Sequence, residues 1–196
     1  MIMDLKKYSE ILKQGGLIAF PTETVFGFGV IYDNKESYDR LIAVKRRPPE
    51  KPFTLMCGNV EDIRKYGVSD ANIDKIIAKF MPGQLTLIMK AKPGLPSWCI
   101  TKEGTIGIRV SSLKLVQDLI NETGKPLLVP SANRSGEPPI TEYNEVVRQF
   151  SNELDGIIDG VTESNVPSTV LLAVNGIKVL REGNIKLEDI QKCLEE

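Results

Sequence analysis

The sequence predicts an α/β protein of the α+β kind, in which helices pack on a sheet of mixed parallel and antiparallel strands. Short apolar runs that end at glycine or proline, such as 17–20 and 127–129, are typical of strands buried on both faces. Segments with helical periodicity alternate with these runs along the chain, as in α/β folds. Near the end, Asn175-Gly176 between two strand-like segments predicts a hairpin, whose strands are antiparallel. The sheet is therefore expected to be mixed.

Helices are expected where apolar residues recur at helical spacing between recognisable start and stop signals. Asp, Asn, Ser or Thr marks the starts, with Asn59, Ser69 and Thr141 as expected N-caps, and glycine or proline marks most of the ends. In chain order, the expected helices cover 4–14, 33–47, 59–66, 69–80, 111–122, 141–150 and 186–194.

Strands are expected where short apolar runs stop at turn residues. Pro21 ends the first of them, and Gly27 and Gly29 are expected to take loop conformations that other residues avoid. Because side chains alternate along a strand, Arg109 should project to the face opposite its apolar neighbours Ile108 and Val110. In chain order, the expected strands cover 17–20, 30–32, 53–57, 85–89, 105–110, 127–129, 156–159, 168–174 and 177–181.

Length and composition describe one ordinary globular domain covering 1–196. The chain has 41% hydrophobic and 26% charged residues, and it contains no apolar run long enough to span a membrane. Its start lacks the apolar core of a signal peptide. The three cysteines are scattered and odd in number, so we expect them to be reduced and buried, in a cytoplasmic protein.

Charge and histidine content exclude several classes of function. The net charge of −1 argues against wholesale attraction to nucleic acid or membrane, although it leaves room for a local basic patch. The absence of histidine excludes Ser-His and Cys-His nucleophilic pairs, histidine bases and histidine-ligated metals. Any chemistry must therefore use carboxylates, lysine, arginine, hydroxyls, backbone amides or a bound cation.

Two polar loops follow expected strands, at the place where α/β sheets bind ligands. Thr22-Glu23-Thr24 follows the strand 17–20, and the serine- and asparagine-containing loop 131–136 follows 127–129. Loops of this kind can present hydroxyl and backbone N–H groups to a phosphate or a carboxylate. Taken alone, the first loop is better explained as a turn whose Thr and Glu cap a neighbouring helix, and the second can also be an ordinary Asn/Ser turn.

Basic residues in and at the ends of expected helices and strands are further candidates for binding an anion. Lys45 and Arg47 stand at a helix end, where they can bind an anion or simply favour the helix dipole. Arg109 lies in an otherwise apolar strand, so its charge must be met by a carboxylate of the protein or by an acidic group of a ligand. Arg181, at the end of the expected strand 177–181, also needs a partner for its charge, but its position at the strand end makes this a weaker indication. Dinucleotide and P-loop fingerprints are absent, and the pattern favours a pocket for anionic groups that works by positioning and charge neutralisation.

Several short motifs occur in one order along nearly the whole chain, and together they closely resemble the YrdC-domain family of threonylcarbamoyl-AMP synthases. The motifs are Pro21-Thr22-Glu23-Thr24-Val25-Phe26-Gly27, Lys45-x-Arg47-Pro48, Thr105-Ile106-Gly107-Ile108-Arg109, Pro130-Ser131-Ala132-Asn133-x-Ser135-Gly136, Pro167-Ser168-Thr169-Val170 and Arg181-x-Gly183.

The resemblance implies a twisted mixed sheet with a concave, positively charged groove. It also implies a reaction in which L-threonine, bicarbonate and ATP, with Mg²⁺, give threonylcarbamoyl-AMP and pyrophosphate. Partner proteins would then transfer the threonylcarbamoyl group to an adenosine beside the anticodon of certain tRNAs, and contact with tRNA or double-stranded RNA is possible.

Site residues follow from the resemblance by motif position. The catalytic set would be Lys45, Arg47 and Arg109, and the metal would be carried by the ATP phosphates and not by protein ligands. Threonine would be held by Thr22, Arg109, Ser131 and Ser168, and ATP by Lys45, Arg47, Thr105, Ser131, Asn133, Thr141 and Arg181.

Two other functions stay open at this stage. The run 53–57 is closer to the YciO-type branch of the family, and Met56 stands where many members have histidine. This branch would act on a related carbamoyl-adenylate or on modified tRNA. The other alternative is a module that binds double-stranded RNA or tRNA without catalysis, against which the net charge of −1 speaks.

Overall fold

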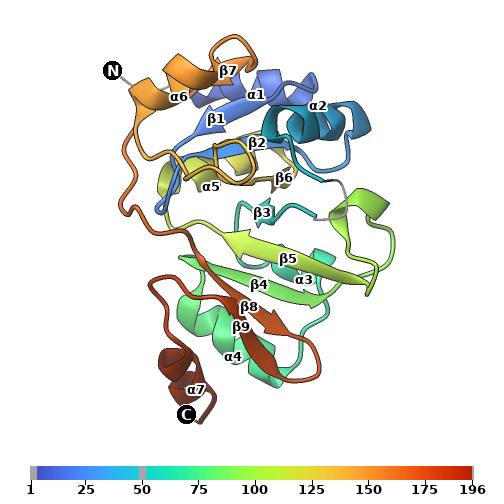
Figure 1. The fold of residues 1–196 in the computed structure, drawn as a ribbon. Helices are drawn as coiled ribbons and strands as arrows, with labels where there is room; N and C mark the ends of the chain where they lie inside the picture. Colours follow the sequence, from blue (N-terminus) through green and yellow to red (C-terminus); the bar gives the residue numbers. More distant parts are fainter. Residues whose placement is uncertain (1–3, 49–51, 196) are drawn as a thin grey trace.

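The computed structural model describes residues 4–48 and 52–195, and within them one continuous mixed sheet runs through the molecule (Figure 1). The strand order is β7-β1-β2-β6-β3-β5-β4-β8-β9. The pairs β1/β7, β3/β5 and β4/β8 are parallel and the other neighbours antiparallel, which confirms the predicted mixed sheet. The strands are β1 (Ile18–Phe20), β2 (Gly27–Ile31), β3 (Leu55–Cys57), β4 (Leu85–Lys90), β5 (Thr105–Val110), β6 (Leu127–Leu128), β7 (Gly156–Ile157), β8 (Thr169–Ala173) and β9 (Ile177–Arg181).

Helices form close to the expected positions. Asp4 and Asn34 cap the first two helices by accepting hydrogen bonds from backbone N–H groups of the first turn. Three expected caps are wrong. Asp70, and not Ser69, caps α4, and α6 begins two residues after Thr141 and has no side-chain cap. The third, Asn59, accepts from the N–H of Asp62 but lies before α3, which has no side-chain cap. The helices are α1 (Leu5–Lys13), α2 (Lys35–Lys45), α3 (Ile63–Tyr66), α4 (Ala71–Phe80), α5 (Lys114–Thr123), α6 (Tyr143–Phe150) and α7 (Leu187–Glu195), with a 3₁₀ turn at Ser97–Cys99.

The central strands are buried on both faces, as their continuous apolar sequence predicts. In β1, Ile18 and Phe20 belong to an apolar cluster shared with α1 and α5. The residue between them, Ala19, belongs to a second cluster shared with α2, α4 and α6. Figure 1 shows α1, α2 and α6 beside the β7-β1-β2 end of the sheet, and α4 and α7 beside the β4-β8-β9 end. The core therefore lies on two sides of the sheet.

Gly27 and Gly29 lie inside β2, so the expectation that they form a loop is wrong. Neither has a positive φ. A Cβ on Gly27 would lie 2.6 Å from Val129 Cγ1, and one on Gly29 would lie 2.5 Å from Phe20 Cε1. Glycine is needed here because neighbouring side chains pack directly against the strand backbone.

The cysteines are free and buried, as the sequence predicts. Burial is the main reason why the pKa of Cys57 and that of Cys99 are raised to about 12, so both remain thiols. None of the helices in the described part of the chain is long and apolar enough to cross a membrane.

Candidate active site

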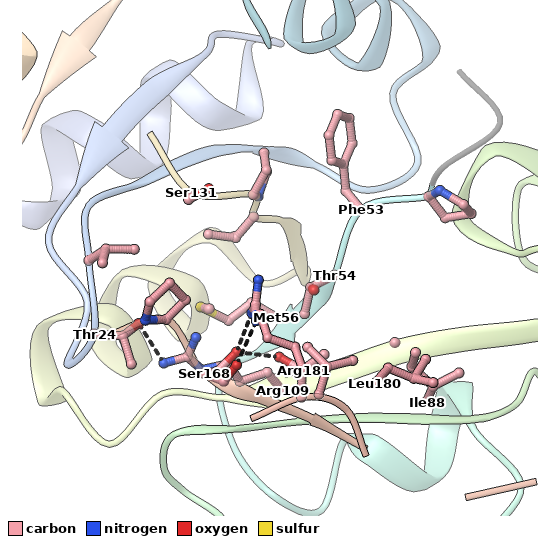
Figure 2. Close-up of a pocket in the computed structure, with 18 of the residues that line it drawn as sticks. Thr24, Phe53, Thr54, Met56, Ile88, Arg109, Ser131, Ser168, Leu180 and Arg181 are labelled. Atoms are coloured by element: carbon pink, nitrogen blue, oxygen red, sulfur yellow. Dashed lines mark hydrogen bonds between the residues drawn. The ribbon is translucent and has the colours of Figure 1, made fainter. Parts of the chain in front are cut away.

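A cavity of about 510 Å³ opens over the middle of the sheet and gathers residues from both ends of the chain. Its lining comes from β3, β4, β5, β8 and β9 and from the segments that follow β1, α2 and β6. Figure 2 shows Arg109, Arg181 and Ser168 grouped at one end, with Ser131 and Phe53 across from them. Segments far apart in sequence thus meet around one hollow.

Strand alternation builds the floor of this cavity. Thr86 and Ile88 of β4 and Gly107 and Arg109 of β5 line it, while the residues between them, such as Ile108, belong to the core. Cross-strand pairing of Ile88 with Gly107 keeps the two rows on the same face. The prediction that Arg109 faces away from its apolar neighbours is confirmed.

Three arginines from distant segments line the cavity: Arg47 after α2, Arg109 in β5 and Arg181 at the end of β9. Burial lowers the pKa of Arg47, and partial burial followed by the positive charge of Arg109 lowers the pKa of Arg181. All three nevertheless stay protonated, because a guanidinium does not lose its proton in proteins. The Arg47 guanidinium also lies 5.0 Å from the ring centre of Phe53, within cation–π range.

The charge of Arg109 is met by a carboxylate of the protein, which is one of the two kinds of partner that its sequence position predicts. Arg109 Nη2 donates to Glu23 Oε1 at 2.7 Å and to Thr24 Oγ1 at 3.0 Å, and Nε donates to the carbonyl of Gly83 at 3.3 Å. Glu23 has no exposed side-chain surface and Arg109 only 7%. The pair nevertheless stands at the cavity, since Arg109 is part of its lining.

Lys45 is not part of the cavity lining and instead contacts the loop that carries Ser131. Its Nζ donates to the carbonyl of Ser131 at 2.7 Å and to Asn133 Oδ1 at 2.8 Å. Ser131 Oγ donates to the same Asn133 oxygen at 2.6 Å. Burial, and after it the charge of Arg47, lowers the pKa of Lys45 to about 8. Lys45 therefore holds the loop from behind.

The closing hairpin supplies another corner of the cavity. Arg181 Nε donates to the carbonyl of Ser168 at 3.0 Å, and its Nη2 donates to Ser168 Oγ at 3.2 Å. The same hydroxyl lies 2.9 Å from Thr86 Oγ1 across the β4/β8 pair. The hydroxyls of Thr86 and Ser168 and the guanidinium of Arg181 thus form one hydrogen-bonded network at the cavity.

The sequence-predicted site residues fall into three groups. Arg47, Arg109, Ser131, Ser168 and Arg181 line the cavity. Thr22, Lys45, Thr105 and Asn133 lie one contact behind it, through hydrogen bonds to Thr24, Ser131 and Thr101. Thr141 is outside the lining, and its carbonyl accepts a hydrogen bond from Thr162.

Hydroxyl residues in the lining escaped the sequence analysis. Thr54, Thr86 and Thr101 border the cavity in addition to the two predicted serines and to Thr24 of the predicted polar loop. Alternation was the usable signal for Thr86, because it occupies the polar phase of an otherwise apolar strand. The role of Glu23 as the partner of Arg109 was also missed.

Cation-binding groups are scarce around the cavity. The described residues contain no group of three or more His, Cys, Asp or Glu side chains that could hold a metal ion. The described lining offers hydroxyls and guanidinium groups, which suit anionic ligands.

Comparisons with known proteins agree with this architecture. A curated threonylcarbamoyl-AMP synthase of Pseudoalteromonas translucida (strain TAC 125) is 38% identical over 175 residues, which cover 87% of this chain and 92% of that protein. The crystal structure of P. abyssi Sua5 complexed with L-threonine is 29% identical, with a TM-score of 0.91, and covers 96% of this chain. This chain spans only 56% of that Sua5 chain.

The crystal structure of E. coli YciO is also similar, with 26% identity and a TM-score of 0.89, and it covers 95% of this chain and 92% of its own. The family model Sua5_yciO_yrdC, described as telomere recombination, matches residues 10–183. That match includes all of the residues that line the cavity. The chain therefore belongs to the Sua5/YciO/YrdC family.

Proposed function

We propose that this chain, as a single domain, is a threonylcarbamoyl-AMP synthase. It would join L-threonine and bicarbonate as a carbamate and transfer the adenylyl group of ATP to that carbamate. The proposal rests above all on one cavity in which three arginines and several hydroxyls converge. The family and the 38% identical synthase support the same activity.

The proposed chemistry needs no nucleophile from the protein. Threonine nitrogen forms a C–N bond to the carbon of bicarbonate with loss of water, which yields a carbamate. A carbamate oxygen then forms a bond to the α-phosphorus of ATP while the bond to the β-phosphate oxygen breaks, and pyrophosphate leaves. Bringing two anions together and neutralising the leaving group are the main tasks, and arginines perform both.

Threonine is assigned to the end of the cavity where Arg109 and Ser168 meet. A carboxylate there would accept from the Arg109 guanidinium, and the Thr86–Ser168 hydroxyl pair offers partners for the ammonium or hydroxyl of an amino acid. Ser131 would reach threonine from the opposite wall. Thr22 would act through the loop that presents Thr24, since its own hydroxyl donates to the carbonyl of Val25.

ATP is assigned to the remaining cations of the cavity. Arg47 and Arg181 would contact phosphate oxygens, and Lys45 with Asn133 would hold Ser131 in place for them. Thr105 supports Thr101 at the rim through a 2.8 Å contact between their hydroxyls, and Thr141 would lie near the nucleotide. Together these groups would form the positively charged groove of the family.

Mg²⁺ fits this site as a companion of the nucleotide. In the described lining the oxygen donors are hydroxyls and carbonyls, and Glu23 is already committed to Arg109 and Ser111. A divalent ion would therefore be held mainly by ATP phosphates, and when bound it would neutralise their charge.

Product transfer requires other proteins. Threonylcarbamoyl-adenylate would pass to partners that attach the group to tRNA, and the chain would work in the cytoplasm, where its three buried thiols stay reduced.

A second candidate is an activity of the YciO type. It is favoured by the YciO structure, which is similar to this chain over nearly its own full length, and by Met56 in the cavity lining. Such an enzyme would act on a related carbamoyl-adenylate or on modified tRNA.

The deciding experiment incubates the full chain with labelled threonine, bicarbonate, ATP and Mg²⁺. A labelled adenylate should form, and pyrophosphate release should require threonine and bicarbonate together. ATP turnover indifferent to threonine would contradict the synthase, and turnover of a modified tRNA in place of threonine would favour the YciO-type activity. RNA binding that weakens steeply with salt, without any adenylate, would support the non-catalytic alternative.

A further inference from the structure

Glu23 is a wholly buried carboxylate with a partner on each oxygen. Its Oε1 accepts from Arg109 Nη2 at 2.7 Å, and its Oε2 accepts a very short hydrogen bond from Ser111 Oγ. Its backbone carbonyl accepts from Gln84 Nε2 at 3.4 Å. A buried carboxylate is tolerated only when paired and hydrogen-bonded in this way, so Glu23 is fixed in one orientation.

Arg109 is fixed in turn by two of its three guanidinium nitrogens. Nη2 is shared between Glu23 and Thr24, and Nε is bound to the carbonyl of Gly83. Within residues 4–48 and 52–195, no hydrogen bond uses Nη1. Because the guanidinium is planar and rigid, holding Nε and Nη2 also determines where Nη1 lies.

The geometry of the pair differs from that of a purely structural ion pair. An arginine and a carboxylate that serve only each other commonly meet through two parallel hydrogen bonds. Here Glu23 uses a single oxygen for Arg109 and gives the other to Ser111. That arrangement leaves Nη1 without a hydrogen bond to any described residue, on a side chain that lines the cavity.

Charge balance gives Glu23 a second task. Arg181 lies close enough to Arg109 for the charge of Arg109 to lower the pKa of Arg181, after the larger effect of partial burial. Glu23 neutralises Arg109, which allows both arginines to occupy one end of the cavity. Arg181 forms no ion pair with any of the described carboxylates. Its positive charge can therefore interact with an anionic ligand in the cavity.

We infer that Glu23 is a positioning residue for amino-acid binding: it orients Arg109 so that Nη1 receives the carboxylate of threonine. The inference rests on the proposed function, in which Arg109 contacts that carboxylate. Ser111 is the second support, because it donates to the carboxylate oxygen that Arg109 does not use and so helps to fix the plane of the Glu23 carboxylate.

The test measures L-threonine and ATP affinities separately, by calorimetry on the full chain. Glu23→Gln keeps the shape but removes the charge, and it should weaken threonine binding by about tenfold to a hundredfold while ATP binding is retained. Glu145→Gln is the matched control: this carboxylate also pairs with an arginine, Arg148, but on the exposed face of α6. It should leave both affinities unchanged.

A double-mutant cycle separates positioning from a general loss of structure. In an Arg109→Ala background, Glu23→Gln should cause no further loss of threonine affinity, because there is no guanidinium left to orient. If Glu23→Gln fails to fold in thermal denaturation, Ser111→Ala replaces it, with a smaller loss confined to threonine.

Three results overturn the inference alone: wild-type threonine affinity in Glu23→Gln, parallel losses for threonine and ATP, or additive losses in the cycle. A wild-type chain that binds ATP but never threonine would instead overturn the proposed function, and the inference with it.

Discussion

Lys45 holds Ser131 from behind, although the two residues are 86 positions apart in the sequence. The Lys45 Nζ lies 2.7 Å from the carbonyl oxygen of Ser131, and Lys45 as a whole is only 2% exposed. A cation that the sequence places at a helix end, ready for a phosphate, is thus used to anchor a loop of the cavity. Burying the charged ammonium of Lys45 costs free energy of hydration, and this cost should be measurable as a pH dependence of stability.

Replacing Lys45 with methionine should remove a pH dependence of stability. The pKa of Lys45 is about 8 in the folded chain, against about 10.4 for an unfolded lysine. Between these values the unfolded chain binds more protons, so this residue makes folding more favourable as pH rises. Relative to Lys45→Met, the wild type should gain about 1–2 kcal/mol from pH 8 to pH 9.5 in urea unfolding. Parallel curves for the two proteins would refute the assignment.

Replacing Arg109 with alanine should separate the two substrates. The side chain lines the end of the cavity assigned to threonine, so threonine affinity should fall by about a hundredfold while ATP affinity changes little. Calorimetry with each ligand alone measures both values. Arg148→Ala, at an exposed arginine on α6, is the control. Equal losses for the two ligands would argue against the assigned threonine contact.

Gly29→Ala should destabilise the fold through overpacking of β2. The new Cβ would lie 2.5 Å from Phe20 Cε1 in a fully buried site, and the expected cost is about 1–3 kcal/mol. Gly107→Ala is the comparison, because its Cβ would meet Thr86 Cγ2 at an ordinary 3.5 Å. That variant should stay within about 0.5 kcal/mol of wild type in urea unfolding. Equal losses in both variants would mean that the close approach to Phe20 is not the cause.

Arg134→Ala should loosen the loop that carries Ser131. Arg134 donates a very short hydrogen bond to the carbonyl of Val44 and pairs with Glu153, and its side chain is 16% exposed. Losing these bonds should cost about 1–3 kcal/mol in denaturant unfolding. The matched change Arg148→Ala removes an exposed pair with Glu145 and should cost no more than about 0.5 kcal/mol. If the two variants lose the same stability, Arg134 does not act as an anchor.

Local patterns were sufficient for much of the fold. Alternation around Arg109 correctly predicted the face to which it projects, because a period of two is a property of the strand alone. The Asn175-Gly176 turn correctly predicted the antiparallel β8–β9 hairpin, since turn chemistry is equally local.

Contacts between segments far apart in the chain could not be predicted from the sequence. Glu23, in the loop after β1, and Arg109, in β5, are 86 positions apart, and no local pattern signals their pairing. The need for glycine at position 29 arises from Phe20 across the β1/β2 pair, so a loop was predicted where the structure has a strand. The direction of Lys45 likewise depends on where the loop after β6 arrives. Each of these features is a consequence of tertiary approach and not of local preference.

The position of the β8–β9 hairpin has a consequence for how the protein is made. Ser168 and Arg181 leave the ribosome well after β4 and β5 have been synthesised, and β8 is the neighbour that β4 needs on its outer side. Until the hairpin emerges, a nascent chain carries an unpaired apolar edge at β4, which is open to pairing with other strands. Translation that stalls before the hairpin should therefore yield an inactive, aggregation-prone fragment instead of a weakened enzyme.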